Sequence, residues 1–270
     1  DPILIFGWFG FPAMGVRGAA LASVLSNVLF LIAALCILIF RDNLIQFANH
    51  SLKSIVESWK KILHVGLPAI ASNLIVPLST ALVTALISSY GQTAVAAYGL
   101  AGRLEAFIIV ILMALGGAIA PYVGQNFGAK RFDRLEEGFK FSMRFILVYS
   151  VFCIVFLYFS AEFFLGFFTA DPEVIKIAKM QLLYCPWGYG FLGVAAICNG
   201  SFNAFGKPMP AMTISIARTL VVYVPMAYLF ASFIGIRGIF VAQVVANILA
   251  GIAGIIWYRL LFRQLSNQNT

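Results

Sequence analysis

Three ionisable side chains, Arg103, Glu105 and Arg218, lie within or at the end of long apolar runs of this sequence. An ionisable group inside a membrane-spanning helix costs about 2.5–3.5 kcal/mol on insertion scales, and such groups often pair with one another or line ion pathways. A carboxyl group can take up and release a proton or a small cation. Glu105 is therefore the candidate in this chain for binding a proton or a small cation.

Arg103 and Glu105 lie close together in GRLEAF, near the outer end of a predicted helix. Two interpretations stay open for them. They could pair with each other or with groups on facing helices inside a cleft, or they could anchor the helix end by reaching water. For Arg218, one to two turns into its helix, we favour a structural role in which the guanidinium group reaches the inner surface.

Helix breakers and asparagines form a second group of candidates. Pro77 lies in the middle of one apolar run, and Pro186 interrupts another within CPWGYGFLG. Proline removes a backbone hydrogen bond and clashes with the preceding turn, so we expect the helices to bend at these residues and the bends to act as hinges. The competing interpretation of these segments is that their glycines pack closely against neighbouring helices. Bent helices with polar side chains line cavities in membranes. The predicted cleft residues are Asn73, Arg103, Asn199 and Asn203.

Motifs that are typical of enzymes fail here on their context. GYGFLG matches the dinucleotide-binding pattern GxGxxG, but it follows no strand and lies inside an apolar run. The sequence contains no GxxxxGK(S/T) motif for ATP hydrolysis and no HExxH motif for zinc. The four cysteines lie in apolar runs without CxxC spacing. We therefore expect no enzyme activity, no metal site and no cofactor.

The composition predicts that the chain lies in a membrane. Hydrophobic residues make up 62% of the sequence and charged residues 10%, whereas about a quarter of the residues are charged in soluble domains. Apolar runs of about 20 residues are long enough to cross the hydrocarbon core as helices. They predict an all-α membrane protein with seven transmembrane helices, at residues 16–40, 65–89, 105–126, 143–168, 180–203, 211–234 and 238–259.

The distribution of lysine and arginine predicts the orientation of these helices. If Arg41 marks the inner end of the first span, twelve of the 18 basic residues fall on the inner side and five on the outer side. This bias agrees with the positive-inside rule. Orientation in the bilayer then explains the net charge of +8, and we expect no nucleic-acid partner.

A segment near the start of the chain recurs near its end. Residues 14–39 and 234–259 are identical at nine positions at a constant offset of 220, beginning with GVRG and GIRG. Six predicted crossings separate the copies, so both copies cross the membrane in the same direction, as in parallel repeats. A simpler alternative explanation for the similarity is a glycine-arginine-glycine turn that caps any helix entering from the outer face. The repeat predicts the end of an N-terminal lobe (1–40), a cytoplasmic linker with an amphipathic helix (41–61), a C-terminal six-helix lobe (62–260) and a cytoplasmic tail (261–270).

Four motifs resemble the multidrug and toxic compound extrusion (MATE) family of transporters. They are GLPA at 66–69, AVAAYGLAGRLEAF at 94–107, APYVGQNFGAKRFDR at 120–134 and FNAFGKP at 202–208. The resemblance covers nearly the whole chain, and AYGLAGRLEAF is most similar to the DinF-like branch. It implies a twelve-helix transporter with two six-helix lobes, of which this chain holds the second lobe and the last helix of the first.

The resemblance also implies an activity. It is the export of organic cations, drugs or toxic amphiphiles through a cleft between the lobes, coupled to inward flow of protons or sodium ions across the bacterial inner membrane. Branches with a coupling carboxylate in the second lobe place it on that lobe's first and fourth helices, but residues 65–89 and 180–203 contain no Asp or Glu. The DinF-like branch uses an aspartate on the first helix of the first lobe, a segment that is absent from this chain. The resemblance therefore implies that this chain supplies half of the cleft and little of the ion site, with Glu105 as its only plausible contributor.

Partners follow from the same resemblance, and two other functions stay open. The expected partners are small-molecule drugs or organic cations, the lipid bilayer and the missing N-terminal lobe of the same protein. One alternative is a lipid-linked oligosaccharide flippase of the same superfamily, which generally lines its cavity with several cationic residues. A non-transporting membrane scaffold is less favoured, because it needs neither bent helices nor a duplicated plan.

Overall fold

The computed structural model describes residues 2–10, 12–41 and 52–267. Within these residues the chain is helical, with short turns and no strand, as the apolar runs predict. Backbone groups in hydrocarbon find no water to bond, so helices that close their own hydrogen bonds are favoured. The chain divides into two compact units, Asp1–Lys61 and Ile62–Thr270.

The first unit is built around one long helix. Its elements in chain order are α1 (Pro2–Phe6), a 3-10 turn η1 (Trp8–Gly10), α2 (Val16–Cys36) and a π-helical turn η2 (Ile37–Arg41). The helix α3 (Leu52–Ser88) starts in this unit and ends in the second. Residues 42–51 of the predicted linker lie outside the described residues. The part of the linker from Leu52 onward is helical.

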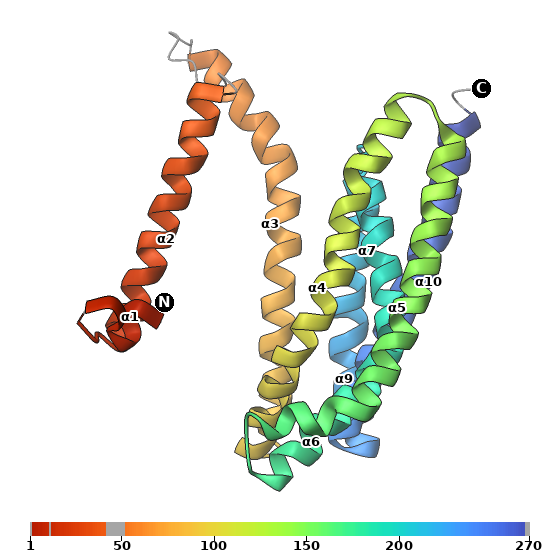
Figure 1. Cartoon of the computed structure of the whole chain (residues 1–270). Coiled ribbons are helices and arrows are strands. Elements are labelled where there is room, and N and C mark those ends of the chain that lie inside the picture. Colours follow the sequence, from red (N-terminus) through yellow and green to blue (C-terminus); the bar gives the residue numbers. More distant parts are fainter. Residues whose placement is uncertain (1, 11, 42–51, 268–270) are drawn as a thin grey trace. The chain divides into compact units, whose positions relative to one another are not determined.

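The second unit contains most of α3, from Ile62 onward, and the helices drawn from yellow to blue in Figure 1. These elements are α4 (Gln92–Gly128), α5 (Phe132–Gly166), α6 (Pro172–Tyr184), the 3-10 turn η3 (Cys185–Gly188), α7 (Tyr189–Ala204), α8 (Pro208–Ile216), the π-helix η4 (Ala217–Tyr223), α9 (Val224–Ile234) and α10 (Ile236–Asn267). Asp171 caps α6, because its Oδ1 accepts a hydrogen bond from the backbone N–H of Glu173 at 2.9 Å.

Among the described residues, six segments are long and apolar enough to cross a membrane. They are Val16–Arg41, Gln92–Gly128, Phe132–Gly166, Pro172–Ala204, Pro208–Ile234 and Ile236–Ser266. These segments correspond to six of the seven predicted spans. The remaining span, 65–89, falls within α3, whose described apolar stretch is Leu74–Ser88. Several helices also extend beyond their apolar runs: α4 begins at Gln92 rather than at residue 105.

Helix α7 lies at the centre of the second unit. It packs against α4 on one side and against α10 on another, while α6 packs against α4 and α5. Small residues permit the close approach of α4 and α7: a Cβ added to Gly116 would lie 3.0 Å from the Cβ of Ala196. Such small-residue contacts replace the hydrophobic driving force that lipid cannot supply between helices.

The two copies of the repeated motif share an unusual backbone turn. The first glycine of each copy has a positive φ, 54° at Gly15 and 65° at Gly235, which glycine adopts without steric cost. Three residues later, a Cβ on Gly18 would overlap the backbone of α1, and a Cβ on Gly238 would overlap the backbone of α9. Each copy thus uses its two glycines to turn into the long helix and to seat that helix against the one before it.

The predicted helix breakers behave differently from each other. Around Pro186, the α-helical pattern gives way to the 3-10 turn η3, which separates α6 from α7. At Pro77 the chain remains α-helical, and α3 runs through that residue. Glycine packing also operates near Pro186, because a Cβ on Gly190 would lie 2.8 Å from the Ser150 hydroxyl oxygen. CPWGYGFLG thus contains both a break in the α-helix and a close glycine contact, and its role as a hinge stays a prediction.

Candidate functional site

A buried carboxyl group forms the centre of the second unit's polar interior. Glu105 is 6% exposed. Its Oε1 accepts a hydrogen bond of 2.9 Å from the hydroxyl group of Tyr189, and its Oε2 accepts one of 3.1 Å from the side-chain amide of Gln181. The carboxyl group is thus held at both oxygens by side chains from two other elements, α6 and α7.

Helical spacing explains why Glu105 lies inside. Ala97 and Ala101 precede it by two turns and one turn, and Leu112 follows it by two turns; all three are fully buried. Residues at these intervals share one helix face. Glu105 therefore lies on the face of α4 that packs inward, and the helix carries the carboxyl group into the core despite its polarity.

The break at η3 brings the two hydrogen-bond donors together. Gln181 lies near the end of α6 and Tyr189 at the start of α7, with Pro186 between them. Gln181 is 1% exposed and Tyr189 is fully buried. The Oε1 atom of Gln181 is buried and has no hydrogen-bond partner among the described residues. Next to them, the thiol of Cys185 lies 3.6 Å from the side-chain oxygen of Gln243.

Glu105 and Arg103 do not pair. Arg103 is exposed, whereas Glu105 is buried and takes both of its hydrogen bonds from neutral side chains. Residues two apart on a helix point to different faces, so pairing between them is geometrically unfavourable. In the part of the chain that the structure describes, the Glu105 carboxyl group has no cationic partner. Burying a charged carboxylate without such a partner is costly, and a bound proton or cation removes that cost.

Arg218 occupies a second polar position. It lies in the π-helix η4, is half-buried, and donates a hydrogen bond of 3.0 Å from its guanidinium group to Oδ1 of Asn247. Asn247 belongs to the repeated motif and is 1% exposed. Single π-helical turns within α-helices occur often at functional sites.

The remaining predicted cleft residues are dispersed. The side-chain amide of Asn199 donates a hydrogen bond of 3.3 Å to the hydroxyl oxygen of Ser215, and its Oδ1 is buried without a partner in the described part of the chain. Asn203 is exposed one turn further along α7. Asn73 falls in α3, and its side chain lies outside the described residues. Among the described residues no group of His, Cys, Asp and Glu could hold a metal ion.

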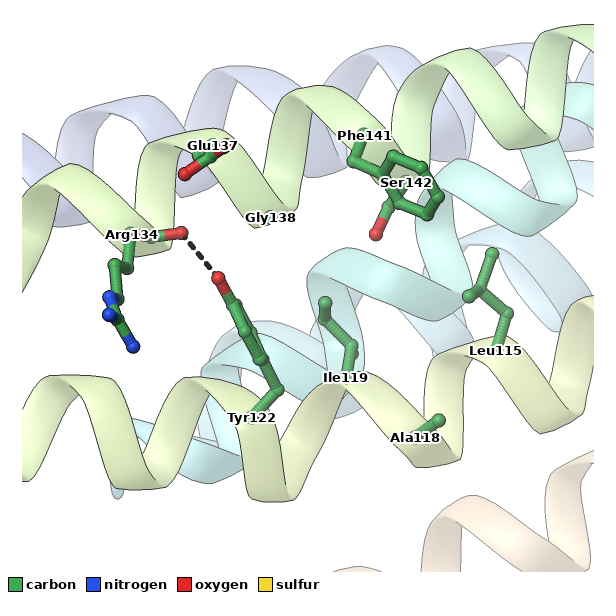
Figure 2. A pocket seen from close by; sticks show the side chains of 9 residues that line it. All are labelled: Leu115, Ala118, Ile119, Tyr122, Arg134, Glu137, Gly138, Phe141 and Ser142. Atoms are coloured by element: carbon green, nitrogen blue, oxygen red, sulfur yellow. Dashed lines mark hydrogen bonds between the residues drawn. The ribbon is translucent and has the colours of Figure 1, made fainter.

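A cavity of about 550 Å³ lies elsewhere, between α4 and α5 (Figure 2). In Figure 2 the hydroxyl group of Tyr122 donates a hydrogen bond of 2.7 Å to the backbone oxygen of Arg134. The Tyr122 ring also lies so close to Gly138 that a Cβ there would overlap it. None of the predicted site residues lines this cavity. It is therefore separate from the Glu105 site.

Sequence reasoning identified Glu105 but missed its partners. Gln181 carried a usable signal, since it is a polar residue at the start of a predicted span. Tyr189 carried none, because tyrosine is common in apolar runs and only the fold brings its hydroxyl group to the carboxyl oxygen. Asn247 lies within the repeated segment 234–259, but its contact with Arg218 was not predicted.

The helical spans and the buried carboxyl group together define a multi-pass membrane protein with a polar site inside its second unit. A model of the MatE family matches residues 68–229, more than half of the chain. The chain therefore belongs to the MatE family, that is, to the multidrug and toxic compound extrusion transporters. Its membership of the DinF-like branch stays a prediction from the sequence.

Named relatives agree with this assignment. A FAD transporter of Shewanella oneidensis is 32% identical over 94% of this chain, and a probable multidrug resistance protein of Bacillus subtilis, YoeA, is 29% identical over 86% of it. The crystal structure of the MATE transporter VcmN of Vibrio cholerae in its bent form is 31% identical, covers 98% of the chain and superposes with a TM-score of 0.81. The chain spans only 56%, 51% and 59% of these three proteins, respectively.

Proposed function

We propose that this chain forms part of an antiporter of the bacterial inner membrane that exports organic cations, drugs or toxic amphiphiles in exchange for protons or sodium ions. In this proposal it supplies a C-terminal six-helix lobe and the last helix of an N-terminal lobe. Membership of the MatE family supports transport, and relatives named as multidrug exporters, such as MepA of Staphylococcus aureus, support the substrate class.

The single observation that carries the coupling role is the environment of Glu105. Its carboxyl group is buried, accepts hydrogen bonds from two neutral donors and has no cationic partner among the described residues. A proton or sodium ion that binds there neutralises the charge, and its release restores the charge. The occupancy of Glu105 thereby changes the electrostatics at the junction of α4, α6 and α7.

Gln181 gives this change a structural consequence. A carboxylate only accepts hydrogen bonds, whereas a protonated carboxyl group also donates one. In the structure the side-chain N–H of Gln181 donates a hydrogen bond to Glu105. The buried side-chain oxygen of Gln181 has no hydrogen-bond partner among the described residues. Rotation of this amide by half a turn presents that oxygen to the protonated form. Gln181 thus transmits the ion-binding state of Glu105 to α6.

The other site residues keep their predicted roles within this proposal. Asn73, Arg103, Asn199 and Asn203 contribute polar contacts to the substrate, and Pro77 and Pro186 act as hinges. The hinge role of Pro186 is supported by the 3-10 turn between Gln181 and Tyr189. A motion of this turn would change the distance of both hydrogen-bond donors from Glu105.

A second candidate substrate is flavin adenine dinucleotide. It is favoured by the FAD transporter of Shewanella oneidensis, which is 32% identical to this chain, and by Arg218. The guanidinium group of Arg218 is half-buried and bonds only to the neutral Asn247 among the described residues. Arginine binds phosphate oxygens in bidentate fashion, so this group suits a diphosphate.

Exchange in vesicles tests the proposal. The full-length protein is reconstituted with either protons or sodium ions concentrated inside, and ethidium is added outside. The expected result is ethidium uptake that accelerates with one of the two ion gradients. Uptake of flavin adenine dinucleotide without ethidium uptake supports the second candidate. Movement of lipid-linked oligosaccharides that ignores both gradients, without ethidium uptake, contradicts the antiporter and supports the flippase alternative.

A further inference from the structure

A groove with a basic lining lies between α5 and α10, remote from Glu105 in sequence. Its volume is about 430 Å³, and four cationic side chains line it: Lys140, Arg144, Arg259 and Arg263. Glu136 is the one carboxylate among its described lining residues. The balance of four positive charges and one negative charge leaves a net charge of +3 in the groove.

Most of this positive charge is uncompensated. Lys140 forms a salt bridge of 2.7 Å with Glu136, one turn before it on α5. Arg144, Arg259 and Arg263 are exposed and have no acidic partner among the described residues. Like charges that converge in this way repel each other, so an anion in the groove is stabilised by all three guanidinium groups.

Aromatic side chains form the floor of the groove, and one stacked pair joins α5 to α10. The ring of Phe139 stacks on that of Tyr258 with centroids 4.2 Å apart and an angle of 6° between the planes, and Phe262 stacks on Tyr258 at 5.9 Å. The hydroxyl group of Tyr258 is buried without a hydrogen-bond partner among the described residues. A buried polar group in this state usually has a partner in water or a ligand. The groove therefore combines a cationic rim, an apolar floor and an unused donor.

The position of the groove along the helices matches the depth of lipid headgroups. Arg144 lies at the start of the apolar run 143–168, and Arg259 lies at the end of the run 238–259. Both arginines belong to the inner side in the predicted orientation. The ends of apolar runs are where the hydrocarbon meets the headgroup region. Basic pockets between transmembrane helices on this side are suited to anionic headgroups.

We propose that the α5–α10 groove binds the phosphodiester headgroup of an anionic glycerophospholipid. The guanidinium groups of Arg144, Arg259 and Arg263 contact the phosphate oxygens, and the aromatic floor contacts the glycerol and the first acyl methylenes. The positive-inside bias explains why these residues lie on the inner side, but not why three unpaired arginines gather over an aromatic floor. This site is independent of the transported substrate and of Glu105.

Thermal unfolding of the full-length protein in detergent tests the site. Phosphatidylglycerol is expected to raise the unfolding temperature in a saturable way, because a ligand that binds only the folded state stabilises it. The groove variant Arg144→Gln/Arg259→Gln/Arg263→Gln should lose most of this rise. The matched variant Lys60→Gln/Arg131→Gln/Lys207→Gln removes three inner-side charges outside the groove and should keep it.

A second variant, which is expected to bind the lipid more tightly, tests the proposal even if the triple variant does not fold. Glu136→Gln removes the carboxylate of the groove and releases Lys140, so half-saturation should occur at about two- to fivefold less phosphatidylglycerol. Glu173→Gln, on α6 and outside this groove, should leave half-saturation unchanged. Equal lipid responses in the groove and matched triple variants overturn the proposal. So does an equal response to phosphatidylcholine or to inorganic phosphate.

Discussion

Two glutamates of the second unit, Glu105 on α4 and Glu162 on α5, show how surroundings decide what a carboxyl group can do. The side chain of Glu162 is 67% exposed and forms an ion pair with Lys179 of α6. Glu105 is 6% exposed and accepts hydrogen bonds from the neutral donors Tyr189 and Gln181. Water and a lysine stabilise the charge of Glu162 continuously. In the proposed mechanism the charge of Glu105 depends on whether a proton or cation binds there, which is the property that ion coupling requires.

The largest expected effect comes from Glu105→Gln. Glutamine retains the shape of glutamate but cannot bind and release a proton, so ion-driven ethidium exchange in vesicles should fall. The loss of a coupling free energy of about 1–3 kcal/mol corresponds to a roughly 5- to 150-fold decrease. Glu162→Gln is the matched control and should exchange at nearly the normal rate. Equal exchange by the two variants would remove the distinction between the two glutamates.

Tyr189→Phe should have the next largest effect, on stability. It removes a hydrogen bond to Glu105, and hydrogen bonds to charged groups contribute about 1.5–3 kcal/mol. In a Glu105→Gln background the same substitution removes a neutral hydrogen bond and should cost only about 0.5–1.5 kcal/mol. Equilibrium unfolding of the four proteins in the cycle measures this difference. The measurement is made at a pH high enough to ionise Glu105, where an identical cost in both backgrounds contradicts a hydrogen bond from Tyr189 to a carboxylate.

Arg103→Gln tests whether Glu105 is independent of the arginine that is nearest to it in the sequence. Because Arg103 is exposed and does not contact Glu105, its substitution should act independently of Glu105→Gln. The changes in unfolding free energy of the single variants should add to that of the double variant within about 0.3–0.5 kcal/mol. A larger deviation reveals that the two residues interact, as one interpretation of GRLEAF suggested.

The smallest effect is expected at the exposed ion pair. Lys179→Gln breaks the contact with Glu162, but exposed pairs contribute little and salt screens them. Unfolding temperatures of the variant and the unsubstituted protein should therefore nearly coincide, and more closely at high ionic strength. A large loss of stability at Lys179→Gln would show that this pair is more important than its exposure indicates.

The sequence was informative where one helix decides the outcome. Runs without charge predicted six spans that the structure describes, and the repeated GVRG and GIRG motifs predicted positions where the backbone has the same turn. Helical spacing also argues against pairing of Arg103 with Glu105, because residues two apart point to different faces.

The partners of Glu105 could not be predicted in the same way. Gln181 and Tyr189 reach the carboxyl group from α6 and α7, and their positions depend on the 3-10 turn at Pro186. The sequence indicated a break there but not the direction in which each side chain would leave it. The basic groove was missed for the same reason, since Arg144 and Arg259 are 115 residues apart and meet only through the packing of α5 and α10.

Chemical labelling tests most directly whether Glu105 takes up a proton in response to substrate. Dicyclohexylcarbodiimide reacts with protonated carboxyl groups in apolar surroundings, and mass spectrometry locates the adduct in the full-length protein. We expect labelling at Glu105, none at Glu162, and less labelling at Glu105 when ethidium is bound. An unlabelled Glu105, or equal labelling of Glu105 with and without ethidium, would contradict it.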